Sequence, residues 1–147
     1  MASALYNNYK KLLFNGSVNP IQSGIYVMLT SGTYNTTATL TSNLANHTTT
    51  GDMAAFSEVG HANGYTRGGK QLQNKTASVV GTAGVFDADD LSWTSSTITA
   101  SGAVIYQSGS NANNSFLIAW LDFGADQISS NGTFTISWNA NGIINIA

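Results

Sequence analysis

Residues 116–146 read FLIAWLDFGADQISSNGTFTISWNANGIINI, and this stretch decides the fold class. Its first eight residues are almost continuously apolar, as in a strand that is covered on both faces. After a turn predicted at Asn131-Gly132, Phe134 and Ile136 alternate with polar residues, which is the period of a half-buried strand. The stretch therefore predicts successive strands joined by tight turns.

The residues before this stretch continue the same pattern. Ser, Thr, Asn and Gly make up about 44% of the chain, and these are residues of turns and, for Thr, of strands. Strand-like segments recur at spacings typical of sandwiches and barrels. The segments are Ile25–Thr30 (with one apolar face), Leu72–Val80, Gly84–Phe86, Leu91–Trp93, Thr97–Thr99 and Ala103–Tyr106. We predict one all-β domain over residues 1–147, either a β-sandwich of jelly-roll or immunoglobulin-like type or a barrel, with one short N-terminal helix.

The N-terminus carries the helical pattern, with Ser3 as the expected N-cap and Gly16 as the stop. We expect residues 1–16 to form a helix arm ahead of a β domain at 21–147. Such a short helix is marginal alone in water, so its apolar stripe packs either on its own sandwich or on a neighbouring subunit. The stripe consists of Leu5, Tyr6, Tyr9, Leu12, Leu13 and Phe14.

Residues 31–52 predict a long loop. Their large apolar side chains are few, namely Tyr34, Leu40 and Leu44. Loops longer than about 12–15 residues in compact domains are usually functional or mobile. The loop and the helix stripe are therefore the candidate contacting surfaces.

Composition excludes several classes of protein. Only 8% of the residues are charged, the net charge is −2, and five Lys/Arg are too few for a nucleic-acid surface. The chain has no Cys, which excludes disulfides, thiolate metal sites and a cysteine nucleophile. No apolar run approaches the length of a membrane span, and the opening residues do not read as a signal peptide.

Candidate chemistry is sparse. The acidic cluster Asp87, Asp89 and Asp90 fits either a calcium site or the polar turn before a strand, and its spacing fails the EF-hand pattern. His47 and His61 lie fourteen residues apart and are expected at the surface. Motifs of serine hydrolases, zinc proteases and phosphate loops are missing from the sequence. We expect no enzyme and no cofactor.

The three tryptophans allow two interpretations. Trp93, Trp120 and Trp138 lie in strand-like segments, which favours core packing. Exposed on a sheet face, they would instead suit stacking against sugars.

Four segments of the chain form a recognisable set: Tyr6–Gly16, Glu58–Thr76, Phe86–Gln107 and Leu117–Ile146. Together they resemble a family of small virion proteins of tailed bacteriophages. The likeness covers nearly the whole chain in order, and it departs from the family at Thr33–Asp52 and at Ser101-Gly102. The opening residues Tyr6–Gly16 are similar to the YxxYKKxLLNG pattern of that family. The other three segments are EVGHANGYTRGGKQLQNKT (Glu58–Thr76), FDADDLSWTSSTITASGAVIYQ (Phe86–Gln107) and the ending Leu117–Ile146.

The resemblance implies a structural component of the virion. A small, uncharged, β-rich domain looks most like a capsid decoration (cement) protein, which binds the major capsid protein on the capsid exterior, often as a trimer. Its partners would then be the major capsid protein and its own copies, without nucleic acid or membrane. Two alternatives stay open: a structural protein of the tail, neck or baseplate, and a virion carbohydrate-binding module for host attachment.

Overall fold

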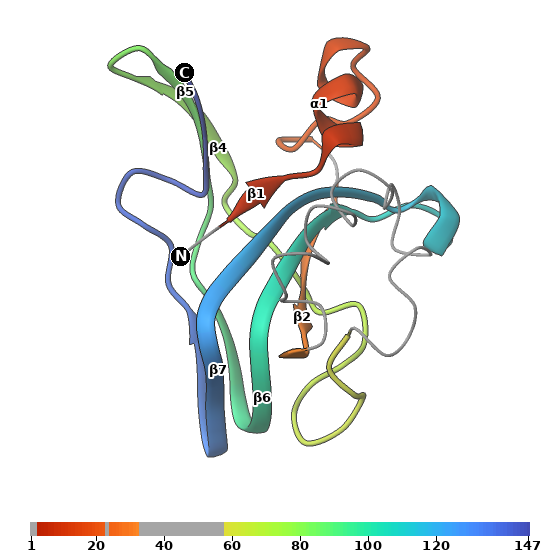
Figure 1. Ribbon diagram of the computed structural model, residues 1–147, viewed down its shortest axis with the longest axis vertical. Helices are drawn as coiled ribbons and strands as arrows, with labels where there is room; N and C mark the ends of the chain where they lie inside the picture. The colour runs from red at the N-terminus through yellow and green to blue at the C-terminus, as the bar shows by residue number, and fades with distance from the viewer. Residues whose placement is uncertain (1–2, 23, 33–57) are drawn as a thin grey trace.

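The computed structural model describes residues 3–22, 24–32 and 58–147 and confirms an all-β fold (Figure 1). Within these residues the fold consists of two antiparallel sheets and one short helix, and the sheets do not close into a barrel. The larger sheet has the order β1 (Ala4–Leu5), β7 (Phe116–Ile136), β6 (Leu91–Gln107), β2 (Ile25–Thr30) and β3 (Lys70–Gln71). The smaller sheet has the order β4 (Thr76–Val80), β5 (Ala83–Asp87) and β8 (Ile144–Ile146). The remaining elements are α1 (Asn7–Phe14) and a 3-10 turn, η3 (Ala112–Asn114).

Strands β6 and β7 are far longer than the sequence predicted. The segments expected as separate short strands join into one strand of 17 residues and one of 21. Asn131, in the predicted turn Asn131-Gly132, has φ 47°, but it forms a bulge inside β7 rather than a turn between two strands. Ser95, with φ 49°, marks a matching irregularity in β6. The neighbouring pairs are Trp93 with Phe134, Ser96 with Gly132, and Ile98 with Ser129.

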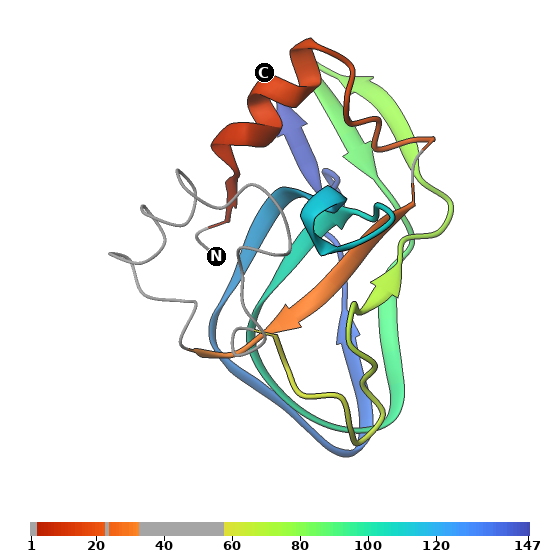
Figure 2. The ribbon, with the colours of Figure 1, turned by 90° about the vertical axis from the view of Figure 1, so that its right-hand side faces the viewer.

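These two strands fold over on themselves. A straight strand of 21 residues would span about 69 Å, whereas a domain of this length has a radius of gyration near 15 Å. The rings of Phe123 and Phe134 lie 6.2 Å apart although both belong to β7. Figure 2 shows the β6–β7 ribbon turning at one end of the molecule. Its two halves consequently face each other across the core.

A buried pair of serines satisfies the backbone at this bend. The N–H of Ile98 donates to Ser129 Oγ at 3.1 Å, and the two serine hydroxyls lie 2.8 Å apart. Ser96 Oγ in turn donates to the carbonyl of Trp93 at 2.9 Å. Ser96 is fully buried, so water cannot replace these bonds.

A tight turn at Asn63-Gly64 packs against the bend. The carbonyl of Asn63 accepts a hydrogen bond from Thr97 N at 2.9 Å. Gly64 has φ 88°, and a Cβ there would lie 2.9 Å from the carbonyl oxygen of Ser95. A side chain would therefore push the turn off the bend, and glycine is required.

The N-terminal helix begins later than the sequence predicted. Ala4 and Leu5 pair with Trp120 and Ala119 as strand β1, so Ser3 is not the N-cap and Leu5 is not in the helix. The N–H of Tyr6 donates to the Ile118 carbonyl at 3.0 Å, which continues the pairing to the first turn. Pairing with β7 outweighs the helical pattern at these residues.

Strand β2 is buried on both faces, which corrects the expectation of one apolar face. It lies between β6 and β3, and Met28 and Thr30 are as buried as Val27. The predicted strand at 72–80 is also shorter, because Leu72 follows β3 and β4 begins at Thr76.

A carboxylate ties the end of β2 to the following turn. Glu58 Oε1 accepts hydrogen bonds from the Tyr65 hydroxyl at 2.8 Å and from Gly68 N at 2.6 Å. The Tyr65 oxygen also accepts from Leu29 N at 3.0 Å. Burial, and then the charge of Glu58, raise the pKa of the Tyr65 hydroxyl. The hydroxyl therefore keeps its proton and donates a hydrogen bond to the carboxylate.

Replacing the central serine of the bend is expected to destabilise the fold. Ser96→Ala removes the donor to the Trp93 carbonyl in a dry site, which costs about 1–3 kcal/mol of unfolding free energy. Urea denaturation measures the loss. The control Ser78→Ala, on an exposed strand, is expected to change stability by less than about 0.5 kcal/mol. Equal stability of the two variants would contradict the role of Ser96.

Removing the Tyr65 hydroxyl tests the carboxylate link. Tyr65→Phe leaves the Leu29 N–H without its acceptor, and we expect a loss of about 1–3 kcal/mol in the same denaturation measurement. Tyr26→Phe, at a partly buried ring on the same strand as Leu29, is the matched control and is expected to unfold like wild type. A Tyr65→Phe protein as stable as this control would show that the hydrogen bonds of the Tyr65 hydroxyl contribute nothing to the free energy of unfolding.

Candidate functional site

The smaller sheet has one apolar face. Val79, Gly84 and Ile146 lie in one row across its three strands, and Phe86 pairs with Ile144 two residues away on the same face. Helix α1 covers the base of this face but not its outer part, where Val79 and Ile146 stay exposed. The sheet therefore presents apolar side chains beyond the cover that the helix provides.

An apolar groove of about 230 Å³ runs between this face and the N-terminal segment. Its walls come from the helix and the linker after it on one side and from all three strands on the other. The linings include Tyr9, Leu13, Pro20, Ile21, Phe86 and Ile144. No charged side chain lines it, so the groove suits apolar groups.

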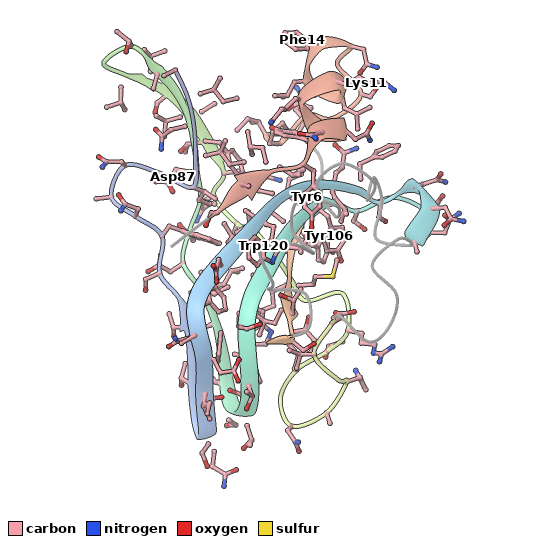
Figure 3. All side chains as sticks on the ribbon, in the orientation of Figure 1. Tyr6, Lys11, Phe14, Asp87, Tyr106 and Trp120 are labelled. Atoms are coloured by element: carbon pink, nitrogen blue, oxygen red, sulfur yellow. The ribbon has the colours of Figure 1, made fainter. Side chains whose placement is uncertain are left out.

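Large exposed apolar side chains gather at this end of the molecule. Phe14 follows Leu13 of the groove wall, and Figure 3 shows it at the far end of α1. The β4–β5 hairpin projects at the same end (Figure 1). Of the six such side chains in the described residues, five belong here: Phe14 (94% exposed), Val79 (79%), Val80 (56%), Ile146 (48%) and Ile21 (38%). We call these five residues and the groove the apolar end.

The structure divides the predicted helix stripe. Tyr6, Tyr9 and Leu12 are buried in the chain's own core, and Leu5 and Leu13 are partly buried. These residues pack the helix on its own sandwich, which is the first of the two interpretations left open by the sequence. Phe14 is the stripe residue with the most exposed side chain, and Leu13 beside it lines the groove. The predicted loop residues Tyr34, Leu40 and Leu44 lie outside the described residues.

Sequence reasoning missed four residues of the apolar end: Ile21, Val79, Val80 and Ile146. A signal was present at Val79-Val80, which precede Gly81. Consecutive apolar residues in a hairpin point to opposite faces, so one of them had to be exposed in any sheet with a single covered face. The exposure of Ile21 and Ile146 depends on how much of the sheet the helix covers, which the pattern does not determine.

A second cleft, of about 560 Å³, lies in the crook of the β7 bend. Its lining mixes Phe123, Ile128 and Phe134 with hydroxyl and amide side chains. It exists because the two halves of β7 face each other, and the exposed Ile128 lies at its surface. It carries no charged side chain.

Two of the clustered acidic residues hydrogen-bond to neighbouring segments of the chain. Asp89 Oδ2 accepts a hydrogen bond from Asn74 Nδ2 at 2.7 Å, and Asp90 Oδ1 accepts one from the backbone N–H of Trp138 at 2.8 Å. Within the described residues no three His, Asp or Glu side chains are placed to share a cation. Asp89 and Asp90 thus bond as the polar turn before β6, which is the second of the two interpretations of this cluster. His61 is exposed, and His47 lies outside the described residues.

The tryptophans are mainly structural. Trp93 and Trp120 are buried, as the core interpretation predicted. Trp138 is partly buried and donates its indole N–H to the Asp89 carbonyl at 2.8 Å. The described tryptophans therefore offer no fully exposed ring to a sugar.

No protein-family model, curated protein or solved structure matches this chain. Across the described ranges, the structure holds no helix of the length and apolar character that crossing a membrane requires. The geometry of the apolar end and the family resemblance of the sequence are therefore the basis for a function.

Proposed function

We propose that this chain is a structural protein of a tailed bacteriophage particle, a capsid decoration protein that binds the outer surface of the major capsid lattice. The observation that carries the proposal is the apolar end. An uncharged groove lined in part by the exposed Ile21 and Ile146, with three more exposed apolar side chains at the same end of the molecule, is typical of a subunit that docks on another protein, as is a content of 8% charged residues.

The helix side of the groove is already ordered in the isolated chain, which suits binding to a lattice. Tyr6 and Tyr9 anchor the helix in the core, so the helix side of the groove does not have to be ordered on binding. Each Å² of apolar surface removed from water contributes about 25 cal/mol. A protein that binds the assembled shell alone stabilises it by mass action, by about 2.7 kcal/mol per site at one hundred times its Kd.

The partners follow from the same proposal. The major capsid protein supplies the surface that covers the groove, and copies of this chain associate on the particle, as trimers in the arrangement that the resemblance implies. With five Lys/Arg in the whole chain, contact with the packaged nucleic acid is no part of the proposal.

Cryo-electron microscopy of intact particles tests the location. We expect regular density for this chain over the icosahedral shell, at three-fold or quasi-three-fold points, because decoration follows the lattice. Density confined to the tail or neck would contradict the proposal and favour the tail alternative.

A surface variant tests the docking residue. Phe14→Ser removes an exposed aromatic ring at the apolar end, and we expect binding to particles that lack this protein to weaken about tenfold, as for an aromatic interface residue worth about 1.4 kcal/mol. Ile128→Ser, at an exposed residue of the other cleft, is the matched control and should bind like wild type. Co-sedimentation with particles measures both. Normal binding by Phe14→Ser would remove this residue from the interface.

A further inference from the structure

Strand β4 is an open edge of the smaller sheet. The order β4-β5-β8 gives it one neighbour among the described residues, and all five of its residues are exposed. Its two valines are among the most exposed large apolar side chains of the residues that the structure describes. An edge of this kind offers backbone N–H and C=O groups as well as side chains.

This edge lacks the features by which sheets prevent pairing. Its sequence, TASVV, contains no charge and no proline. It pairs with β5 over five residues without a bulge, so the strand is not twisted out of reach. Edges of monomeric proteins usually carry at least one of these protections.

The hairpin turn shows which backbone groups face outward. Gly81-Thr82 is a two-residue loop in which Gly81 has φ 60°, as the first central residue of a type II′ turn requires. The closing pair of such a loop exchanges hydrogen bonds, and bonded pairs alternate along the ladder. Val80 and Ser78 therefore bond inward to β5, while the N–H and C=O of Ala77 and Val79 point to the open side.

We propose that β4 pairs antiparallel with β4 of a second copy of this chain, about a two-fold axis at Ser78. In this register Ala77 lies opposite Val79 of the second copy, and their outward N–H and C=O groups exchange hydrogen bonds. The two Ser78 side chains face each other as a non-bonded pair. The two smaller sheets then join into one sheet of six strands, and their apolar faces become continuous.

The charges of the edge suit a second copy as the occupant. The nearest cation, Lys75, lies opposite Gly81 of the second copy, about 20 Å from its own counterpart, which is more than two Debye lengths at physiological salt. The Val79 side chain, 79% exposed in the single chain, packs against Ala77 of the second copy on the same face. The pairing is thus self-complementary in backbone, apolar contact and charge.

The pairing is independent of the proposed function. It uses the outward backbone groups of the β4 edge and is measured on the isolated protein, although Ala77 and Ser78 also line the groove and Val79 belongs to the apolar end. On a particle decorated with trimers, two-fold pairing would link neighbouring trimers.

A single cysteine tests the register, because the chain has none of its own. In Ser78→Cys the two Cα atoms of the non-bonded pair lie about 4.5 Å apart, within the range of a disulfide. We expect mild oxidation of the purified variant to give a covalent dimer on a non-reducing gel. The control Thr76→Cys, also exposed on the same strand, places its two cysteines about 13 Å apart, and we expect it to form no covalent dimer. Equal yields of covalent dimer from the two variants would mean that the cysteines meet by random collision. No covalent dimer from Ser78→Cys would exclude the register. Either result would overturn the proposal.

A charge on the edge gives a second, cysteine-free measurement. Sedimentation of the wild-type protein is expected to show a reversible dimer, and Val79→Lys is expected to weaken dimerisation at least tenfold while leaving the melting temperature unchanged, because Val79 is exposed. A wild-type protein that stays monomeric at all accessible concentrations, or a Val79→Lys protein that dimerises normally, would overturn the pairing. Since no particle is present, these outcomes do not depend on the location of the protein in the virion.

Discussion

The fold depends on one constraint: strands β6 and β7 must bend to fit inside a domain of this size. The bend is made by residues with positive φ at Ser95 and Asn131, and the backbone groups it releases from the ladder bond to the buried hydroxyls of Ser96 and Ser129. A polar core at this point is therefore necessary, and serines provide it with the smallest side chains that can donate and accept. Because the ribbon folds over, Trp93 and Phe134 meet Tyr65 and Phe123 across the core.

The bend also determines where the apolar end lies. It brings β5 and β8 back over the larger sheet, so that Phe86 and Ile144 reach the core. The hairpin of β4 and β5 extends past that core, and α1 is too short to cover it: the helix ends at Phe14. The uncovered apolar surface is consequently the part of the smaller sheet that neither the core nor the helix reaches.

Local patterns in the sequence predicted the all-β class and favoured the burial of Trp93 and Trp120. They failed where a distant partner decides the structure. Leu5 fits a helical stripe but pairs with Ala119, and the positive φ of Asn131 serves a bulge because β6 continues beside it. For the candidate site, Phe14 could be named from the sequence. Ile21 and Ile146 could not, since their exposure depends on the packing of helix against sheet.

The two surfaces proposed for association differ in physical kind, and this difference lets them act together. The groove presents apolar side chains and few backbone hydrogen-bonding groups to a partner, so it selects partners by the shape of their apolar surface. The β4 edge offers backbone hydrogen bonds in a fixed register, so it selects a partner strand that can pair in that register. A second β4 strand fulfils this condition by two-fold symmetry, and it pairs more readily than a strand that carries charge. Both require the rigid hairpin, whose Gly81 turn sets the register and whose apolar face forms the groove wall. Self-association at the edge would hold two grooves in a defined relative orientation. On a periodic lattice this orientation would strengthen binding, because one bound copy raises the effective concentration of the other.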